Sequence, residues 1–263
     1  MRALTRIPIF SYNSLVSTLL TDTKSLEIKL RSKFITKESI ADLEDILTWC
    51  ASHPEVLSVY ITVYGDDFIQ GFDPEELKTY SNETLNALMA KVSTLAQSLF
   101  CLPQTIIMDL KKSAKGIGLE LALAADIRIA SESALFQFNY LDNGVTPMCG
   151  LFSYLAPYLN FNVARSLILS GTTFNIVTLN LLGGFTLTDT KAKDLLTQIF
   201  NQAPVARMQT KRGFLGNNFS NDLNSKIEVE KQIFRATLKT DDYKKDQNFM
   251  GHQEFKEKLQ TMG

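Results

Sequence analysis

Short strand-like runs alternate with longer helix-like segments along most of the chain, and this alternation is the feature that most limits its possible folds. The strand-like runs are short and apolar, most of them rich in β-branched residues, and they are SLEIKLRS (25–32), SVYITVYG (58–65), TIIMDL (105–110) and DIRIAS (126–131). The segments between them have the composition or apolar spacing of helices, and they are 37–53, 74–102 and 115–126. This order predicts an α/β fold.

The last part of the chain has a different pattern. VARSLILSG (163–171) predicts a helix that ends at Gly171, and a charged helical segment begins at about Val229. Residues 201–226 between them are rich in Asn, Gln and Gly and show the weakest pattern, so we expect them to join two parts. We therefore predict a core of residues 1–200 and a C-terminal helical region of residues 201–263.

Composition excludes several classes of function. The chain has 263 residues with 27 basic and 28 acidic side chains, so no overall charge attracts nucleic acid or an anionic membrane. No run approaches the ~18 apolar residues of a membrane span, and the N-terminal stretch IPIFSYNSLVSTLL is too interrupted for a signal peptide. We expect a soluble cytoplasmic protein that binds neither nucleic acid nor membrane.

Cysteine and histidine usage supports the same expectation. The 3 cysteines are odd in number and widely spaced, which is typical of free thiols in a reducing compartment. The 2 histidines form no cluster with cysteines at metal-ligand spacing, so no metal site is predicted.

The segment KGIGLELALAAD (115–126) carries one acid, Glu120, inside an apolar helix that opens with Gly116 and Gly118. A helix N-terminus offers unpaired N–H groups and a partial charge of roughly +0.5 e, which can hold a developing negative oxygen. A carboxylate one turn further along could move a proton on the bound molecule. The alternative is that Glu120 only complements the helix dipole, as acids in a first turn commonly do.

A second glycine-opened turn precedes another predicted helix. In GDDFIQGFDPEEL (65–77), Gly71, Phe72 and Asp73 follow a predicted strand and come directly before the helix. Such a turn can also direct a backbone N–H into a pocket.

The order of these pieces resembles the crotonase (enoyl-CoA hydratase/isomerase) superfamily over residues of about 25–260. The matching pieces are HPEV before SVYITVYG, then FIQGFDPEEL, LPQTIIMDL, KGIGLELALAADIRIASESALFQF, NGVTPMCG, ARSLILSG and EKQIFRATLKTDD. The stretch ELALAADIRIAS is close to the signature of the family. The resemblance implies a crotonase-like spiral of ββα units with a C-terminal helical region that packs into homotrimers, often hexamers. The amphipathic segment with Ile233, Phe234 and Leu238 would need a partner surface in such an assembly.

The resemblance also implies a substrate, an acyl-CoA or acyl-carrier thioester, with coenzyme A as part of the substrate and no separate cofactor. The thioester oxygen would accept hydrogen bonds from the backbone N–H groups of Phe72 and Ile117, the oxyanion hole. Glu120 lies where the family often has its first catalytic glutamate.

The remaining site residues follow from the same match. Gly71, Asp73 and Gly116 would belong to the substrate-binding turns, and Lys256 would contact the nucleotide end of coenzyme A. Tyr140 occupies the position of the second catalytic glutamate.

Tyr140 leaves the reaction open. A tyrosine with an ordinary pKa of about 10 can donate a proton but is a poor base at neutral pH. Hydration and isomerisation often use both carboxylates, whereas decarboxylation of a malonyl-type thioester needs an oxyanion hole and a proton donor. The bulky side chains of Phe72 and Ile117 also leave a second hypothesis, a catalytically inactive crotonase-fold binding or scaffold protein.

Lys111, Lys112 and Lys115 form a small basic cluster. They either contact the phosphates of coenzyme A or form a solvated turn, and a solvated turn is the commoner state of a single surface lysine.

Overall fold

A six-stranded sheet forms the centre of the computed structural model, which describes residues 16–188, 190–215 and 219–245. Its strands lie in the order β1-β2-β3-β4-β6-β9, and all neighbours are parallel except the antiparallel pair β1 and β2. The strand bounds are β1 Val16–Leu20, β2 Ser25–Leu30, β3 Ser58–Val63, β4 Thr105–Asp109, β6 Ile127–Ile129 and β9 Thr186–Leu187. All side chains of β3 are buried, as expected for a central strand covered on both faces.

A smaller three-stranded sheet lies beside the first, in the order β5-β7-β8. β5 (Ser113–Lys115) pairs in parallel with β7 (Leu135–Gln137), which pairs antiparallel with β8 (Phe174–Asn175). Because β5 follows β4 and leads directly into α4 (Ile117–Ala124), the chain turns from the large sheet to the small one immediately before the Glu120 helix.

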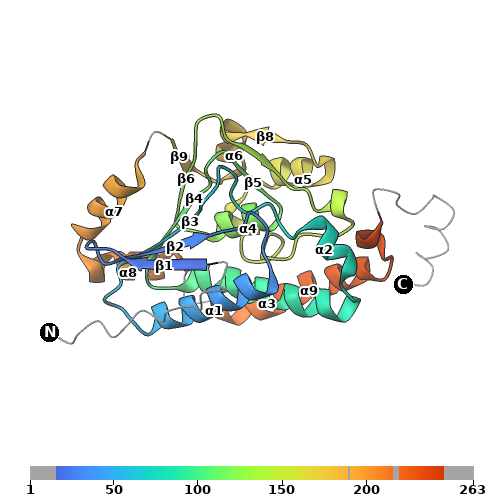
Figure 1. The fold of residues 1–263 in the computed structure, drawn as a ribbon, viewed down its shortest axis with the longest axis horizontal. Coiled ribbons are helices and arrows are strands. Elements are labelled where there is room, and N and C mark those ends of the chain that lie inside the picture. Colours follow the sequence, from blue (N-terminus) through green and yellow to red (C-terminus); the bar gives the residue numbers. More distant parts are fainter. Residues whose placement is uncertain (1–15, 189, 216–218, 246–263) are drawn as a thin grey trace.

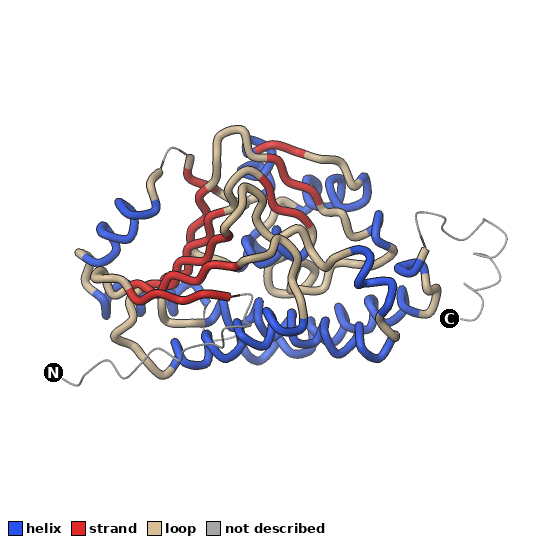
Figure 2. Tube along the Cα trace, in the orientation of Figure 1, coloured by secondary structure: helices blue, strands red, loops and turns tan. Residues whose placement is uncertain are grey.

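Helices cover both faces of the large sheet (Figures 1 and 2). α1 (Lys37–Ala51), α3 (Asn82–Cys101) and α9 (Phe219–Leu238) run along one face. α7 (Ala192–Phe200) covers the other, where Leu195, Leu196 and Ile199 pack on Tyr60, Ile107 and Ile129. The remaining helices are α2 Pro74–Thr79, α5 Phe161–Ser170, α6 Ile176–Leu182 and α8 Pro204–Leu215. The structure confirms the predicted α/β class.

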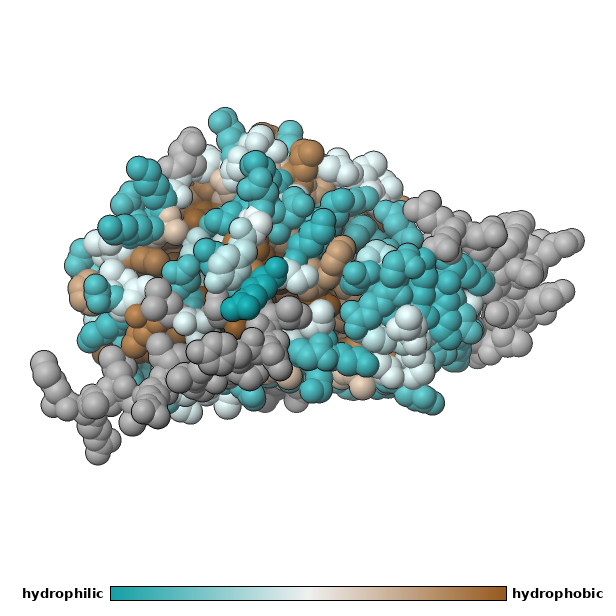
Figure 3. All heavy atoms as spheres, viewed as in Figure 1, coloured by the Kyte–Doolittle hydropathy of each residue, from teal (hydrophilic) through white to brown (hydrophobic). Residues whose placement is uncertain are grey.

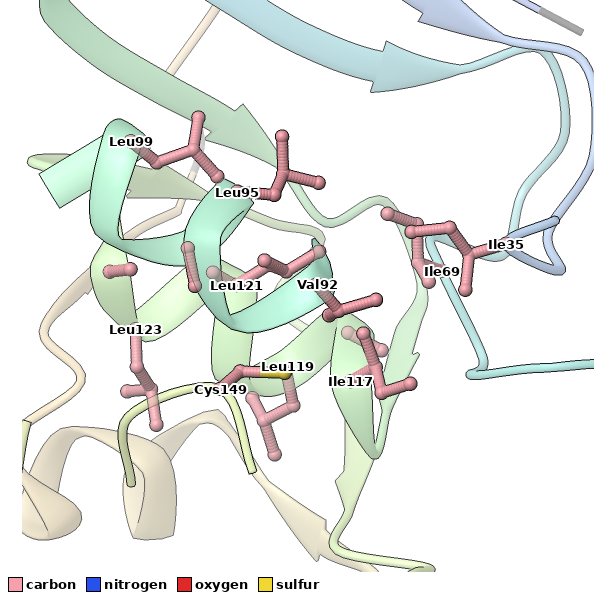
Figure 4. Close-up of a cluster of buried hydrophobic side chains, with 14 of the residues drawn as sticks. Ile35, Ile69, Val92, Leu95, Leu99, Ile117, Leu119, Leu121, Leu123 and Cys149 are labelled. Atoms are coloured by element: carbon pink, nitrogen blue, oxygen red, sulfur yellow. The ribbon is translucent and has the colours of Figure 1, made fainter. Parts of the chain in front are cut away.

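α4 lies inside the molecule, against α3. Figure 4 shows Leu119 and Leu121 of α4 close to side chains of α3 such as Val92 and Leu95, with Cys149 beside Leu119. Every residue of α4 is buried, which explains why its sequence is apolar on all sides instead of along one stripe. Over the face shown in Figure 3, hydrophilic side chains cover much of the surface around this apolar interior.

The long helix predicted over 74–102 is wrong in one respect, because the structure divides it into α2 and α3. Tyr80 has extended backbone angles, and the hydroxyl of Ser81 caps α3 by accepting a hydrogen bond from the N–H of Thr84 at 3.1 Å. A serine at the N-cap is the local signal for this break.

The region 201–226, which we expected to join the core to the charged C-terminal helix, is itself helical over much of its length. α8 occupies 204–215 with a proline in its first turn, and α9 begins at Phe219, ten residues before the predicted start at Val229. The boundary predicted at residue 200 stays a prediction.

α9 packs against its own chain. Phe234 and Leu238 are 1% and 4% exposed and belong to the same hydrophobic core as the sheet, whereas Ile233 is 40% exposed. The apolar face of α9 therefore finds its partner in α3 of the same molecule, and it does not by itself require a second copy. No helix within the described ranges is long and apolar enough to span a membrane.

Candidate active site

Two glycine-containing turns meet at the N-terminus of α4. Gly118 lies so close to the loop after β3 that an added Cβ would overlap the carbonyl oxygen of Ile69. Gly71 has φ +103° and Gly116 has φ +48°, backbone conformations that favour glycine. The absence of a side chain at Gly118 therefore lets the backbone of Ile69, just before the Gly71 turn, lie against the start of α4.

The two residues whose N–H groups the sequence predicts as donors border the same cavity. Phe72 and Ile117 line one small cavity of about 30 Å³, together with Gly71, Gly116 and Tyr140. Within the described part of the chain, neither the N–H of Phe72 nor that of Ile117 donates a hydrogen bond. The cavity holds roughly one or two water molecules, and its other walls are Leu77, Leu85, Met89, Asn139, Asn143, Val145 and Met148.

Glu120 lies behind this cavity and has no exposed surface. Its carboxylate accepts hydrogen bonds from the N–H groups of Cys149 at 2.8 Å and Leu151 at 2.9 Å, with a longer contact to Met148 N at 3.4 Å. The hydroxyl of Tyr140 donates to the same carboxylate. Glu120 is not among the residues that line the cavity, whereas Tyr140 is, so the tyrosine lies between the carboxylate and the cavity.

Burial and the charge of a second acid, Glu230, raise the pKa of Glu120 to about 7, although its hydrogen-bond donors act in the opposite direction. Burial and the neighbouring Glu120 charge raise the pKa of Tyr140 well above its ordinary value. Tyr140 is therefore neutral at physiological pH. It can donate a hydrogen bond or a proton, and it can take up a proton only after it has given its own away.

Glu230 of α9 is the acid that the sequence analysis did not identify. It is 1% exposed, and its carboxylate accepts hydrogen bonds from Gly150 N at 3.1 Å and Ser153 Oγ at 2.7 Å. A signal was present, because Glu230 lies three residues after Ile227 and four before Phe234, on the buried face of an amphipathic helix.

Of the predicted substrate-binding residues, the structure places two at the cavity and one elsewhere. Gly71 and Gly116 are at the cavity, but the Asp73 carboxylate caps α2 by accepting a hydrogen bond from Glu75 N at 2.9 Å, and Asp73 does not line the cavity. Lys256 lies outside the described residues.

Lys111 and Lys112 are paired with acids of their own surroundings. Lys111 Nζ lies 2.7 Å from Asp109 and Lys112 Nζ lies 2.8 Å from Asp66. Both lysines line an open groove that shares no residue with the small cavity, so their contacts are those of a surface ion-pair cluster.

Comparison with known proteins then places the chain. The family model for enoyl-CoA hydratase/isomerase matches residues 26–262, which is nearly the whole chain. The chain belongs to the enoyl-CoA hydratase/isomerase family. This confirms the resemblance on which the sequence analysis depended, and it makes the chain a member of a family of lyases and isomerases.

Relatives of known name have low identity over most of their length. The chain is 27% identical over 236 residues to YngF of Bacillus subtilis (strain 168), covering 87% of this chain and 88% of YngF. It is 25% identical over 220 residues to the short-chain-enoyl-CoA hydratase of Clostridium acetobutylicum, covering 80% of this chain and 83% of that protein.

Solved structures agree on the fold. The crystal structure of enoyl-CoA hydratase from Bacillus halodurans superposes with a TM-score of 0.80 at 21% identity, covering 89% of this chain and 99% of that chain. This enoyl-CoA hydratase/isomerase family member thus combines the family fold with low sequence identity to the solved structures.

Proposed function

We propose that the chain acts on a short acyl-CoA thioester by stabilising its enolate and delivering a proton to it. The single observation that carries this proposal is the pair of unbonded N–H groups, of Phe72 and Ile117, at one cavity with Tyr140 on its wall. Family membership supports the substrate class, since the Clostridium acetobutylicum relative is named a short-chain-enoyl-CoA hydratase.

The two N–H groups form the oxyanion hole of the proposed mechanism. The carbonyl oxygen of the thioester accepts both hydrogen bonds, and these strengthen as negative charge develops on that oxygen in the enolate. Donors that are already oriented inside a dry site need no reorganisation, and a single one is worth about 10²–10³ in rate.

Tyr140 and Glu120 deliver the proton. The hydroxyl of Tyr140 gives its proton to the α-carbon of the enolate, and the phenolate oxygen takes a proton from the Glu120 carboxyl. A pKa of about 7 supports this role, because the Glu120 carboxyl then holds a proton in a substantial fraction of molecules at neutral pH.

Decarboxylation fits this arrangement better than addition of water. Loss of CO₂ from a malonyl-type thioester leaves the electron pair of the broken C–C bond in the enolate, so no base is required. Hydration would need a group that activates water at the cavity, and Tyr140 with its raised pKa is unsuited to that task. Hydration and isomerisation remain the alternative reactions of the family.

The acyl group is expected to be short. A cavity of about 30 Å³ between Phe72 and Met148 leaves no room for a long chain unless side chains move. A one- or two-carbon acyl group needs the smallest displacement of these walls.

The test is turnover of malonyl-CoA and crotonyl-CoA by the wild-type protein and by Glu120→Gln. We expect the wild-type protein to decarboxylate malonyl-CoA. Glu120→Gln should lose turnover while circular dichroism shows an intact fold. The control Glu132→Gln, on the exposed surface, should keep wild-type turnover. Full activity of Glu120→Gln would remove Glu120 from the mechanism.

A catalytically inactive family member is the second candidate. It is favoured by the small cavity and by the complete engagement of the Glu120 carboxylate with donors of its own chain. Calorimetry with acetyl-CoA and crotonyl-CoA separates the two, since binding without turnover of any thioester supports this candidate. Absence of binding counts against both unless an acyl-carrier thioester binds.

We also propose a homotrimer or hexamer. The expectation comes from the family, and it is supported by Phe161 and Leu169 of α5, which are 72% and 64% exposed beside an apolar hollow of about 290 Å³. Light scattering should give a trimeric or hexameric mass, and a monomeric mass at micromolar concentration would contradict the proposal.

A further inference from the structure

The loop 148–153 is held between two buried carboxylates that come from distant parts of the chain. Cys149 N and Leu151 N donate to Glu120 of α4. The intervening Gly150 N donates to Glu230 of α9 instead. Neighbouring N–H groups of this loop thus donate to different carboxylates. The loop therefore links α9 to the Glu120 side chain behind the cavity.

The loop has little freedom to rearrange. Gly150 has φ +112°, and an added Cβ would overlap the ring of Tyr154, whose hydroxyl donates to the Cys149 carbonyl oxygen at 2.5 Å. Ser153 Oγ adds a second bond to Glu230 at 2.7 Å. Any displacement of Glu230 therefore moves the donors that orient the Glu120 carboxylate.

We propose that Glu230 is a positioning residue for Glu120, acting through the loop 148–153 and through its own negative charge. This inference rests on the proposed role of Glu120 as a proton donor. It assigns a function in the site to α9, 110 residues further along the chain.

The groups around Glu120 determine in which direction Glu230 shifts the pKa of Glu120. The titratable groups facing Glu120 are Tyr140, Cys149 and Tyr154, each with a pKa raised well above its ordinary value by burial, and Glu230. Among the described residues, no lysine or arginine forms an ion pair with Glu120 or Glu230. Burial raises the pKa of Glu230 as well. In its ionised form Glu230 has no ion-pair partner among the described residues, and its charge favours the protonated form of Glu120.

The test is a titration of the Glu120 carboxyl. Infrared spectroscopy monitors the C=O stretch of its protonated form, and the loss of this band in Glu120→Gln assigns the band to Glu120. In Glu230→Gln the like charge is absent, so the titration midpoint of Glu120 should move to lower pH than in the wild-type protein. The matched control is Glu228→Gln, because Glu228 lies on the same helix, is exposed, and pairs with Lys231 at 2.7 Å. Glu228→Gln should leave the midpoint unchanged.

Turnover supplies a second readout. If protonated Glu120 is the proton source, activity falls as pH rises through its pKa, and this descending limb should move to lower pH in Glu230→Gln but not in Glu228→Gln. A folded Glu230→Gln protein with the wild-type Glu120 titration overturns the inference.

Ser153→Ala keeps the inference testable if Glu230→Gln does not fold. The loss of the hydrogen bond from Ser153 Oγ raises the pKa of Glu230, so Glu230 carries less charge at neutral pH. The titration midpoint of Glu120 should therefore again move to lower pH, and an unchanged midpoint overturns the inference. The carboxyl titration requires no substrate, so it separates this inference from the proposed function. Failure of Glu120→Gln to reduce turnover would count against the proposed function, whereas the effect of Glu230 on the Glu120 titration is decided by the carboxyl titration itself.

Discussion

Glu120 is a carboxylate without solvent contact, and its environment contains opposing effects. The N–H groups of Cys149 and Leu151 and the hydroxyl of Tyr140 favour the charged form, whereas burial and Glu230 favour the neutral form. The balance brings the pKa of Glu120 to about 7, where a group can both hold and release a proton under physiological conditions.

Tyr140→Phe removes the hydroxyl that we propose as the proton donor at the cavity wall, without changing the shape of the ring. We expect malonyl-CoA turnover to fall by about 10²-fold or more, the usual contribution of a general acid. The control is Tyr158→Phe, because Tyr158 is 51% exposed and outside the cavity. Steady-state kinetics measure both, and equal activity in the two variants would exclude Tyr140 as the donor.

Gly118→Ala introduces a methyl group against the carbonyl oxygen of Ile69, which is backbone and cannot rotate away. We expect a loss of about 1–3 kcal/mol in the free energy of unfolding and a loss of turnover, since the two turns must separate. Gly65→Ala is the control because an added Cβ at Gly65 meets nothing within 4 Å. Urea unfolding checks the stability difference, and wild-type stability in Gly118→Ala would contradict the close approach.

At the scale of elements, α9 contacts both the hydrophobic core and the loop 148–153 that binds Glu120. The same helix face that buries Phe234 also carries Glu230 to the loop 148–153. Packing of α9 on α3 thus determines where the Glu230 carboxylate lies.

Phe234→Ala tests this packing. Truncation of a fully buried phenylalanine usually costs about 3–5 kcal/mol of stability, whereas Ile233→Ala at the adjacent, 40% exposed position should cost much less. Urea unfolding of both variants measures the difference. Similar losses in the two would mean that α9 does not pack on this face.

At the scale of the whole molecule, the buried acids make folding depend on pH. The folded-state pKa of Glu120 is about 7, above the value of about 4.3 expected in an unfolded chain. Between these values the folded protein holds a proton that the unfolded chain has released. The contribution of Glu120 to stability is therefore complete below about pH 4 and is lost as pH rises toward 7.

The prediction is a fall in the wild-type free energy of unfolding from pH 5 to pH 7.5 that is smaller in Glu120→Gln. Comparison of the two proteins by urea unfolding at each pH isolates the contribution of Glu120 from those of other groups. A pH dependence that is identical in both proteins would contradict the raised pKa.

Much of the architecture follows from local pattern. The strands at 25–30, 58–63 and 105–109, the apolar helix around Glu120 and the helix ending at Gly171 all lie where composition and periodicity predict them. The errors are also local: Ser81 caps a new helix inside a continuous helical pattern, and α9 begins ten residues before the expected start at about Val229. Tertiary packing decides such segments because helix propensity alone is a weak preference.

The sequence by itself determined the family, the glycine turns at 71 and 116, and the presence of one acid in an apolar helix. Only the tertiary structure decided that Tyr140 donates to Glu120, that Glu230 approaches from α9, and that the cavity is small. The physical reason is that a periodic sequence pattern is local information, because it indicates only which face of its own segment is buried. The distance between carboxylates 110 residues apart depends on how the helices and loops that carry them pack together.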